Sequence, residues 1–310
     1  MRAVRVSAYG GPDVLQVQEI PQPTAGAGQV VLKVLAGGIN PLDAWFRSGH
    51  LAARFARPLP YTPGTDAVGS VAELGEGVDT FELGDIVMGV LPVLSDGAYA
   101  EYTVIDVERL IHVPQGLDPI LAASAMTPAL TGVQMVERAQ TLGSCYRILI
   151  LGALGGVGRA AIAAALAGGI DITAAVLPSQ EDETRALGVQ QVVTADDAAR
   201  PETLGGSFDV VLDLVGPDAV LPWERAIGPD GKVVSSVPLP PAAFQRQDVS
   251  TIPFAFSADA RTLATVATML RDGKLTVSQI EVLALDETAK AHAVLPGNAG
   301  GKKFVVDPAR

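Results

Sequence analysis

The sequence predicts an α/β protein that combines a twisted β-barrel with a doubly wound parallel sheet. Three observations lead to this prediction: a first part rich in short alternating strands, a change to helical spacing near Pro119, and a glycine-rich turn between a strand and a helix. A chain of 310 residues is long enough for two such domains.

Composition excludes several function classes. Hydrophobic residues make up 48% of the chain, which is ample for a buried core, and the net charge of −12 argues against nucleic acid or an anionic membrane as a partner. A single cysteine, Cys145, excludes an internal disulfide and a cysteine-cluster zinc site. The chain opens without a signal-peptide pattern and has no run of about 18 apolar residues. We therefore expect a soluble, cytoplasmic protein.

The first 120 residues follow a strand pattern. Apolar and polar residues alternate between Gly and Pro punctuation in six segments: 2–10, 13–22, 29–40, 67–75, 85–90 and 98–106. Many short strands at close spacing predict a twisted, barrel-like antiparallel domain.

The second part of the chain alternates strands with helices. Residues 119–139 have helical spacing, and strands are predicted at 147–153, 172–177, 190–193, 208–216 and 232–237, which indicates a parallel sheet with crossover helices. A helix follows at 259–273, and strands return at 280–285 and 302–307. We predict a nucleotide domain over 122–273, with 1–121 and 274–310 forming the other domain.

A glycine-rich turn carries the functional signal. Gly152, Gly155, Gly156 and Gly158 form G-A-L-G-G-V-G directly after a strand, and a helix to about Ala167 follows. Glycine there lets backbone N–H groups approach a pyrophosphate, and the helix N-terminus adds a positive dipole end. This context predicts a dinucleotide site, whose expected lining also includes Val157 in the turn and Val215 after a later strand.

Over its whole length the chain resembles the zinc-independent medium-chain dehydrogenases/reductases, the group of quinone oxidoreductases and enoyl reductases. The matching segments, in order, are 10-GGPDVLQV-17, 38-GINPLDAWFRSG-49, 60-PYTPGTDAVGSVAELGEGV-78, 83-LGDIVMG-89, 96-DGAYAEYTV-104, 118-DPILAASAMTPALTG-132, 152-GALGGVG-158, 208-FDVVLDLVG-216 and 301-GKKFVV-306. The resemblance implies a GroES-like catalytic domain closed by the C-terminal strands, an inserted Rossmann domain and a ligand cleft between them. It also implies a homodimer through the edge strands of the nucleotide domain.

The zinc-dependent branch of that family does not match. Where its pattern has a ligating Cys and a Gly-His-Glu, this chain has Asn40–Pro41 and 64-GTD-66. A catalytic zinc needs three protein ligands, and the three histidines, at 50, 112 and 292, are far apart in sequence. We expect no metal.

Two polar residues are implied as active-site groups by the resemblance. It places Asn40 and Thr131 beside the nicotinamide and the substrate carbonyl, where an amide and a hydroxyl can orient a hydride transfer without a strong acid. Asn40 could instead be a turn residue before Pro41, and the Thr131 hydroxyl could bond its own helix backbone.

The adenosine end departs from the resemblance. Members that use NADPH have a Ser and a Lys or Arg where Val176, Leu177 and Gln180 stand here. The first cation after the strand is Arg185, and residues 181–183 before it are all acidic, which costs about 1 kcal/mol per exposed close pair with a 2′-phosphate.

The residue that usually binds the ribose hydroxyls of NADH is missing as well. That residue is an acid at the end of the second strand, near Ala175, and only Ser179 could bond a ribose. We expect weak nucleotide binding, with NADPH narrowly ahead of NADH on the strength of the resemblance.

The substrate side departs too. The tyrosine that many quinone and enoyl reductases place in this segment is replaced by Trp45 and Leu51. The adjacent His50 could protonate an enolate or carbonyl oxygen, or could be an exposed loop residue. Trp45, Phe46 and Tyr61 could line an apolar substrate cleft, with Tyr61 as a second proton donor, or belong to the core.

Two functional hypotheses follow. The first is an NAD(P)H-dependent oxidoreductase that reduces a quinone or an enoyl compound, polyketide-type intermediates included, without metal. The second is a redox-silent member that acts as a cyclase, dehydratase, isomerase or binding protein in the same cleft. The glycine turn, Asn40 and Thr131 favour the first, while the missing ribose anchors favour the second.

Overall fold

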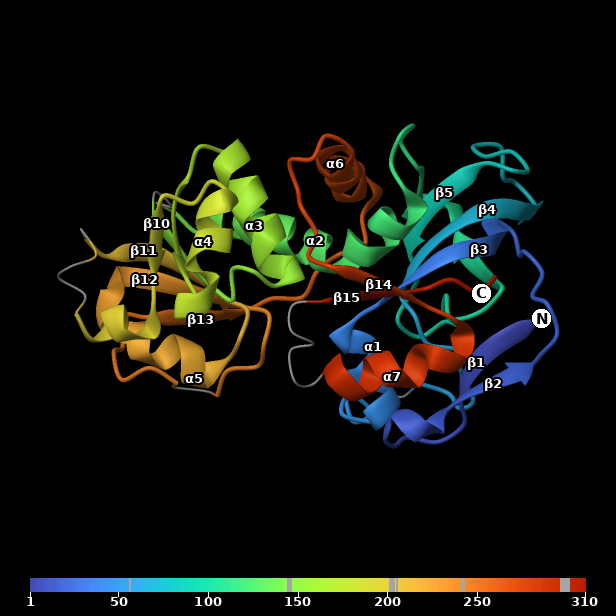
Figure 1. Cartoon of the computed structure of the whole chain (residues 1–310), viewed down its shortest axis with the longest axis horizontal. Coiled ribbons are helices and arrows are strands. Elements are labelled where there is room, and N and C mark those ends of the chain that lie inside the picture. Colours follow the sequence, from blue (N-terminus) through green and yellow to red (C-terminus); the bar gives the residue numbers. More distant parts are fainter. Residues whose placement is uncertain (56, 144–146, 201–203, 205, 241–242, 296–301) are drawn as a thin grey trace. The chain divides into compact units, whose positions relative to one another are not determined.

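Two large sheets organise the described residues, and each belongs to its own unit. The computed structural model describes residues 1–310 except 56, 144–146, 201–203, 205, 241–242 and 296–301, so Cys145 lies outside the described residues. One unit consists of Met1–Thr127 and Ala258–Arg310, and the other of Pro128–Ser257 (Figure 1).

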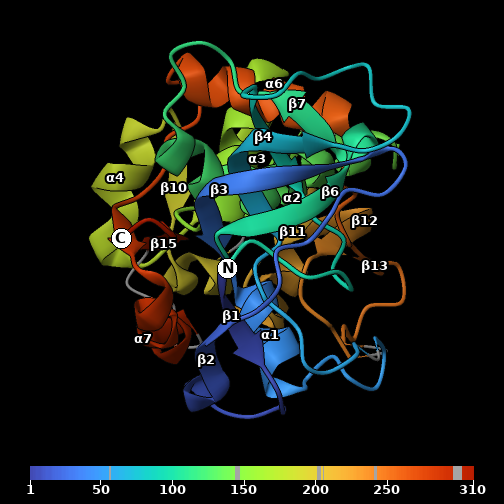
Figure 2. The same ribbon diagram turned by 90° about the vertical axis from the view of Figure 1, so that its right-hand side faces the viewer.

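The first unit contains a seven-stranded sheet with the order β14-β15-β3-β4-β5-β7, in which β6 also pairs with β3. Figure 2 shows β3, β4 and β6 side by side. A separate hairpin consists of β1 (Arg2–Val6) and β2 (Leu15–Glu19). The strands of the larger sheet are β3 (Gln29–Ile39), β4 (Asp66–Leu74), β5 (Ile86–Val90), β6 (Tyr102–Asp106), β7 (Leu110–His112), β14 (Ile280–Leu283) and β15 (Lys303–Val306).

The C-terminal strands return to this sheet, as the sequence predicted. β15 pairs antiparallel with β3, with Val305 opposite Gly38 and Val306 opposite Gly37. The alternating apolar residues of β15 therefore enter the same core as those of the N-terminal strands, which closes the GroES-like domain.

Helix α1 (Pro41–Ser48) follows β3 because its ends carry clear signals. Asn40 precedes it in an extended conformation, and Pro41 fits the first helical position, where no N–H is needed. Gly49 ends the helix with φ of 80°, in the left-handed region that glycine adopts at no steric cost.

The division between the units differs from the predicted one. It falls at Thr127/Pro128 and Ser257/Ala258, so α6 (Ala260–Arg271) groups with the first unit. The sequence placed this helix in the nucleotide domain, because helical spacing does not tell which sheet a helix packs on. The first unit also contains α7 (Thr288–Val294).

The second unit is a Rossmann domain. Its six-stranded sheet has the order β10-β9-β8-β11-β12-β13, and every pair in it is parallel. After β10 the chain crosses back to β11, which lies beside β8. The strand order therefore reverses between β8 and β11, and this is the switch point where such sheets bind ligands. The strands are β8 (Arg147–Leu151), β9 (Asp171–Ala175), β10 (Gln191–Val193), β11 (Phe208–Asp213), β12 (Ile227–Ser235) and β13 (Ser250–Pro253).

Strand β8 shows why this sheet is covered on both faces. Ile148 and Ile150 pack into one core with α3 (Gly156–Ala167), and Leu149 and Leu151 pack into another. Continuous apolar strands of this kind are typical of parallel sheets that carry helices on both sides. In Figure 1, α3 and α4 (Glu181–Ala186) lie on one face and α5 (Pro217–Val220) on the other.

Helix α2 (Pro119–Gln140) is long and apolar enough, by length and composition alone, to cross a membrane. Its mean hydropathy reaches 1.2 over an 18-residue window. However, 78% of that window is buried inside the protein, which is typical of a core helix.

Candidate functional site

The glycine turn is built around positions that side chains cannot occupy. Gly152 has φ of 80°, and its carbonyl accepts the Gly155 N–H at 3.1 Å, which closes the turn. A Cβ on Gly158 would lie 2.4 Å from the Gly152 oxygen and 2.5 Å from the Ala153 oxygen. The turn and the first turn of α3 can therefore approach this closely only with glycine at 158.

The ends of β8 and β11 meet at this turn. A Cβ on Gly152 would lie 2.9 Å from a methyl carbon of Val215, a residue that is 55% exposed. The buried carboxylate of Asp213 holds the loop after β11 by accepting the Val215 N–H at 3.1 Å and the Gly216 N–H at 2.8 Å. Ser235 adds a hydroxyl bond to the same carboxylate at 2.7 Å.

These residues fit a dinucleotide. The first N–H groups of a helix have no partner within the helix, and Gly156, Val157 and Gly158 occupy these positions in α3. Helix α2 packs closely on them, because a Cβ on Gly132 would lie 2.3 Å from the Val157 oxygen. Thr131, the preceding residue, is buried in α2 beside this contact.

The ribose-reading segment matches the sequence expectation. β9 ends at Ala175, so no acid stands at the strand end. Leu177 is 63% exposed in the following loop, and the neighbouring Ser179 is also exposed. No described residue at these positions supplies a cation.

Two of the three acidic residues of α4, which the sequence predicts to repel a 2′-phosphate, are paired with arginines. Glu181 pairs with Arg185 at 3.2 Å. Glu183 pairs with Arg159, a buried residue of α3 that the sequence reading missed. Repulsion of a 2′-phosphate by this helix is therefore weaker than a count of acids suggests, and Arg185 is already engaged.

In the first unit, Asn40 is one partner in a buried polar cluster. Its side-chain nitrogen donates to Asp66 at 2.8 Å, and Asp66 also accepts the N–H of Thr127 at 3.1 Å and its hydroxyl at 2.5 Å. Burial raises the pKa of Asp66, while the Thr127 and Asn40 hydrogen bonds oppose the rise. An accepting carboxylate turns the amide nitrogen of Asn40 inward and its oxygen away.

A second buried cluster lies around Asp43. Its carboxylate accepts the N–H of Asn40 at 2.8 Å and the hydroxyl of Tyr99 at 3.2 Å. The Tyr99 oxygen lies 3.2 Å from Nε2 of His292, whose pKa burial lowers to about 3, so the imidazole is neutral. Burial raises the pKa of Asp43 to about 7.

The three predicted aromatic residues do not form one surface. Trp45 is 39% exposed, with the exposed His50 ring at 6.4 Å, whereas Phe46 and Tyr61 are core residues. Adjacent helix positions point about 100° apart, which separates Trp45 from Phe46. Burial raises the pKa of Tyr61 to about 12, which weakens its case as a proton donor.

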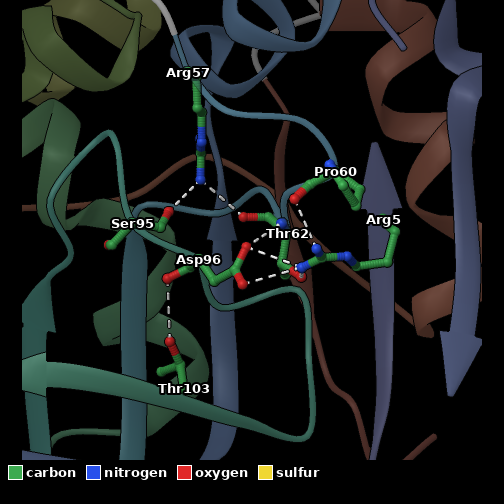
Figure 3. A network of polar contacts seen from close by, with 7 residues as sticks. All are labelled: Arg5, Arg57, Pro60, Thr62, Ser95, Asp96 and Thr103. Carbon is green, nitrogen blue, oxygen red and sulfur yellow. Dashed lines mark hydrogen bonds and ion pairs between the residues drawn. The ribbon is translucent and has the colours of Figure 1, made fainter. Parts of the chain in front are cut away.

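Arg57 holds the segment around Tyr61. Its guanidinium carbon lies 3.7 Å from the centroid of the Tyr61 ring, and the group donates to the carbonyls of Thr62, at 3.0 Å, and Ser95. Asp96 accepts the Thr62 N–H at 2.6 Å (Figure 3). Arg5 bonds Asp96 at 3.0 Å and the Pro60 carbonyl at 2.7 Å, which completes the network.

The residues present do not fit a catalytic zinc. Among the described residues, no group of three or more His, Cys, Asp and Glu could hold a metal ion. Asp66, which stands in the segment where the zinc-dependent pattern has its Glu, is occupied by Asn40 and Thr127.

Comparisons with known proteins match two successive parts of the chain. Residues 26–115 match the alcohol dehydrogenase GroES-like domain, and residues 187–305 match the family described as zinc-binding dehydrogenase. The chain is 31% identical over 254 residues to the chloroplastic quinone-oxidoreductase homolog of Spinacia oleracea, covering 78% of this chain and 76% of that protein. The chain belongs to the quinone oxidoreductase family.

Family membership extends over the whole chain. A chloroplast envelope quinone oxidoreductase homolog of Arabidopsis thaliana is 28% identical over 326 residues, covering 99% of this chain and 98% of that protein. The quinone oxidoreductase structure from Coxiella burnetii superposes with a TM-score of 0.88 at 27% identity, covering 99% of both chains. The protein is therefore an NAD(P)H-dependent oxidoreductase of the medium-chain dehydrogenase/reductase type, and zinc independence is consistent with its residues.

The sequence alone did not predict a role for three residues: Arg159, Asp213 and Asp66. Arg159 had a visible signal, because it is the one charge in an alanine-rich helix directly after the last glycine of the turn. The partners of Asp213 and Asp66 lie on other strands and helices, so no local pattern could identify them.

Proposed function

We propose that the protein reduces a conjugated carbonyl compound, either a quinone or an enoyl compound, with NAD(P)H and without metal. The observation that carries this proposal is the glycine turn at the switch point, with Gly158 packed against Gly152 and the exposed Val215 beside it. When bound, NAD(P)H supplies a hydride to the ring or the β-carbon of the substrate.

The chain's own residues bind the cofactor, orient the substrate and supply the proton. The N–H groups of Gly156, Val157 and Gly158 bind the pyrophosphate at the start of α3. Asn40, with its nitrogen held by Asp66, offers its amide oxygen as a fixed acceptor, and Thr131 offers a hydroxyl. Of the two predicted proton donors, His50 is the one exposed to solvent.

For the substrate class, Trp45 is the apolar contact that the exposed surface supports. Its ring is partly exposed beside His50, so a flat conjugated ring or enone could stack there while the imidazole faces its oxygen. Polyketide-type intermediates fall within this class.

For the cofactor, we propose that both dinucleotides bind, with NADPH narrowly preferred. The absence of an acid at Ala175 leaves nothing to reject the 2′-phosphate at the strand end, and two of the three acids of α4 are already paired. A ratio of affinities under about tenfold, or ~1.4 kcal/mol, is expected.

We also propose a homodimer that acts in the cytoplasm. β13 lies at the edge of the parallel sheet, where a second copy could add its own strand. One cysteine in the chain suits a reducing compartment. Sedimentation and cell fractionation test these two points separately.

Oxidation of NADH and NADPH followed at 340 nm, with a panel of quinones and enones, tests the reaction. The matched variant is Gly156→Asp, because an acid at the first turn of a helix is favourable for folding but places a carboxylate against the pyrophosphate. We expect turnover by the native protein and loss of both binding and turnover in the variant. Turnover that survives Gly156→Asp unchanged, or a native protein that oxidises neither dinucleotide with any substrate, would contradict the proposal.

A further inference from the structure

Arg159 stands at a position where it can affect dinucleotide binding. It directly follows Gly158 and is the one charged residue of α3. Its side chain is buried, and Nε donates to the carbonyl of Leu154, inside the glycine turn, at 3.1 Å. The guanidinium therefore lies against the turn that would hold the pyrophosphate.

The other end of the guanidinium reaches the ribose-reading side. It pairs with Glu183 of α4, the helix that follows β9. In Rossmann folds the end of the second strand is where the adenosine ribose, and any phosphate on it, is recognised. The pair thus bridges the pyrophosphate turn and the segment that distinguishes NADPH from NADH.

The two partners differ in exposure. The Arg159 side chain is 6% exposed, whereas that of Glu183 is 59% exposed. A buried cation keeps most of its attraction for an anion, while an exposed carboxylate has room to move away from it into solvent. An anion that arrives from solvent would therefore replace Glu183 and leave Arg159 in place.

We propose that Arg159 is the cation that receives the 2′-phosphate of NADPH, and that Glu183 occupies it when that phosphate is absent. The inference rests on the proposed function, since it assumes a dinucleotide on the glycine turn. A guanidinium binds phosphate with two parallel hydrogen bonds, and the phosphate carries nearly twice the charge of the carboxylate it displaces. Competition with Glu183 accounts for a narrow rather than a strong preference for NADPH.

Arg185 is the rival cation, because it lies in α4 itself. It is paired with Glu181 in the same way, but its side chain is 48% exposed. Solvent screens an exposed pair, so releasing Arg185 should change phosphate binding far less than releasing Arg159.

The test compares two substitutions that remove the same charge from the same helix. Glu183→Gln removes the carboxylate partner of Arg159, and Glu181→Gln removes that of Arg185. Purified protein is titrated with NADPH and with NADH, followed by nucleotide fluorescence, at low and moderate salt. We expect Glu183→Gln to raise the affinity for NADPH by about tenfold, or ~1.4 kcal/mol, and to change the affinity for NADH by less than about twofold. Glu181→Gln should change the ratio of the two affinities by less than about twofold.

In the double variant Arg159→Gln/Glu183→Gln, the ratio of NADPH affinity to NADH affinity should fall below that of the native protein. An unchanged ratio in Glu183→Gln, or an equal gain in both single variants, overturns the assignment of Arg159. A gain that persists in the double variant overturns it as well. If the native protein and all variants bind neither dinucleotide, the proposed function fails and the inference with it.

Discussion

The side-chain amide of Asn40 donates to the carboxylate of Asp66 at 2.8 Å, between two buried residues from different segments of the chain. Because an ionised carboxylate only accepts, this bond fixes which end of the amide faces away from it. The orientation of a predicted active-site group is thus set by a residue 26 positions later in the sequence.

Asp66→Asn should lower kcat by at least about tenfold while leaving dinucleotide affinity within about twofold. The new amide can donate as well as accept, so it no longer fixes the orientation of Asn40. Steady-state kinetics and fluorescence titration measure the two effects, and urea unfolding shows whether the fold is intact. An unchanged kcat in a folded variant would show that the orientation of Asn40 does not matter.

Asp43 should make stability fall as the pH rises. Its carboxyl has a pKa of about 7 in the folded protein, above its ordinary value, so between these values the folded state holds a proton that the unfolded state has lost. Its contribution is complete below about pH 4 and disappears as the pH rises through about 7, at most ~1.4 kcal/mol per pH unit.

Asp43→Asn removes this titration and should flatten the decline. The free energy of unfolding in urea, measured between about pH 4 and 8, gives the slope. Asp79→Asn, at an exposed position, is the control and should keep the native slope. Parallel curves for the native protein and Asp43→Asn would rule out this assignment.

Gly158→Ala should destabilise the protein by about 1–3 kcal/mol and weaken both dinucleotides equally. The added methyl group would meet two backbone oxygens, which cannot rotate away as a flexible side chain would. Gly169→Ala is the comparison for strain without contact, because a Cβ there meets nothing within 4 Å although φ is 67°. A loss in Gly158→Ala no larger than that in Gly169→Ala would contradict a large cost of close packing at Gly158.

Arg57→Ala should cost about 2–4 kcal/mol, because it removes the guanidinium that donates to the carbonyls of Thr62 and Ser95 and packs on the Tyr61 ring. Arg54→Ala is the matched control, since Arg54 is exposed and contacts the Phe55 ring at 5.3 Å. Chemical denaturation compares the two. A cost for Arg57→Ala no larger than for Arg54→Ala would contradict a structural role for the network in Figure 3.

Elemental analysis of the purified protein should find well under one zinc per chain, because a catalytic zinc needs three protein ligands and Asp66 is already occupied. Treatment with a chelator should leave activity unchanged. One zinc per chain, lost to the chelator together with activity, would show that Asp66 leaves Asn40 and Thr127 to ligate a metal or that other side chains supply the ligands.

Local patterns in the sequence predicted most of the elements. Strand alternation identified β3, β4 and β5, and the strand–glycine–helix succession identified β8 and α3 within a few residues. Short elements were missed: α1, β7, β13 and α7 have between three and eight residues, too few for a period to emerge.

The sequence by itself determined the fold class, the family and the glycine turn, because period, punctuation and motif order are local properties of the chain. Only the tertiary structure decided that Phe46 and Tyr61 are core residues, that Asp66 holds Asn40, and that Arg159 pairs with Glu183. Each of these depends on which residues from distant segments meet, and on the burial that makes a charge or a hydrogen bond costly to lose. Spacing along the chain carries no information about either.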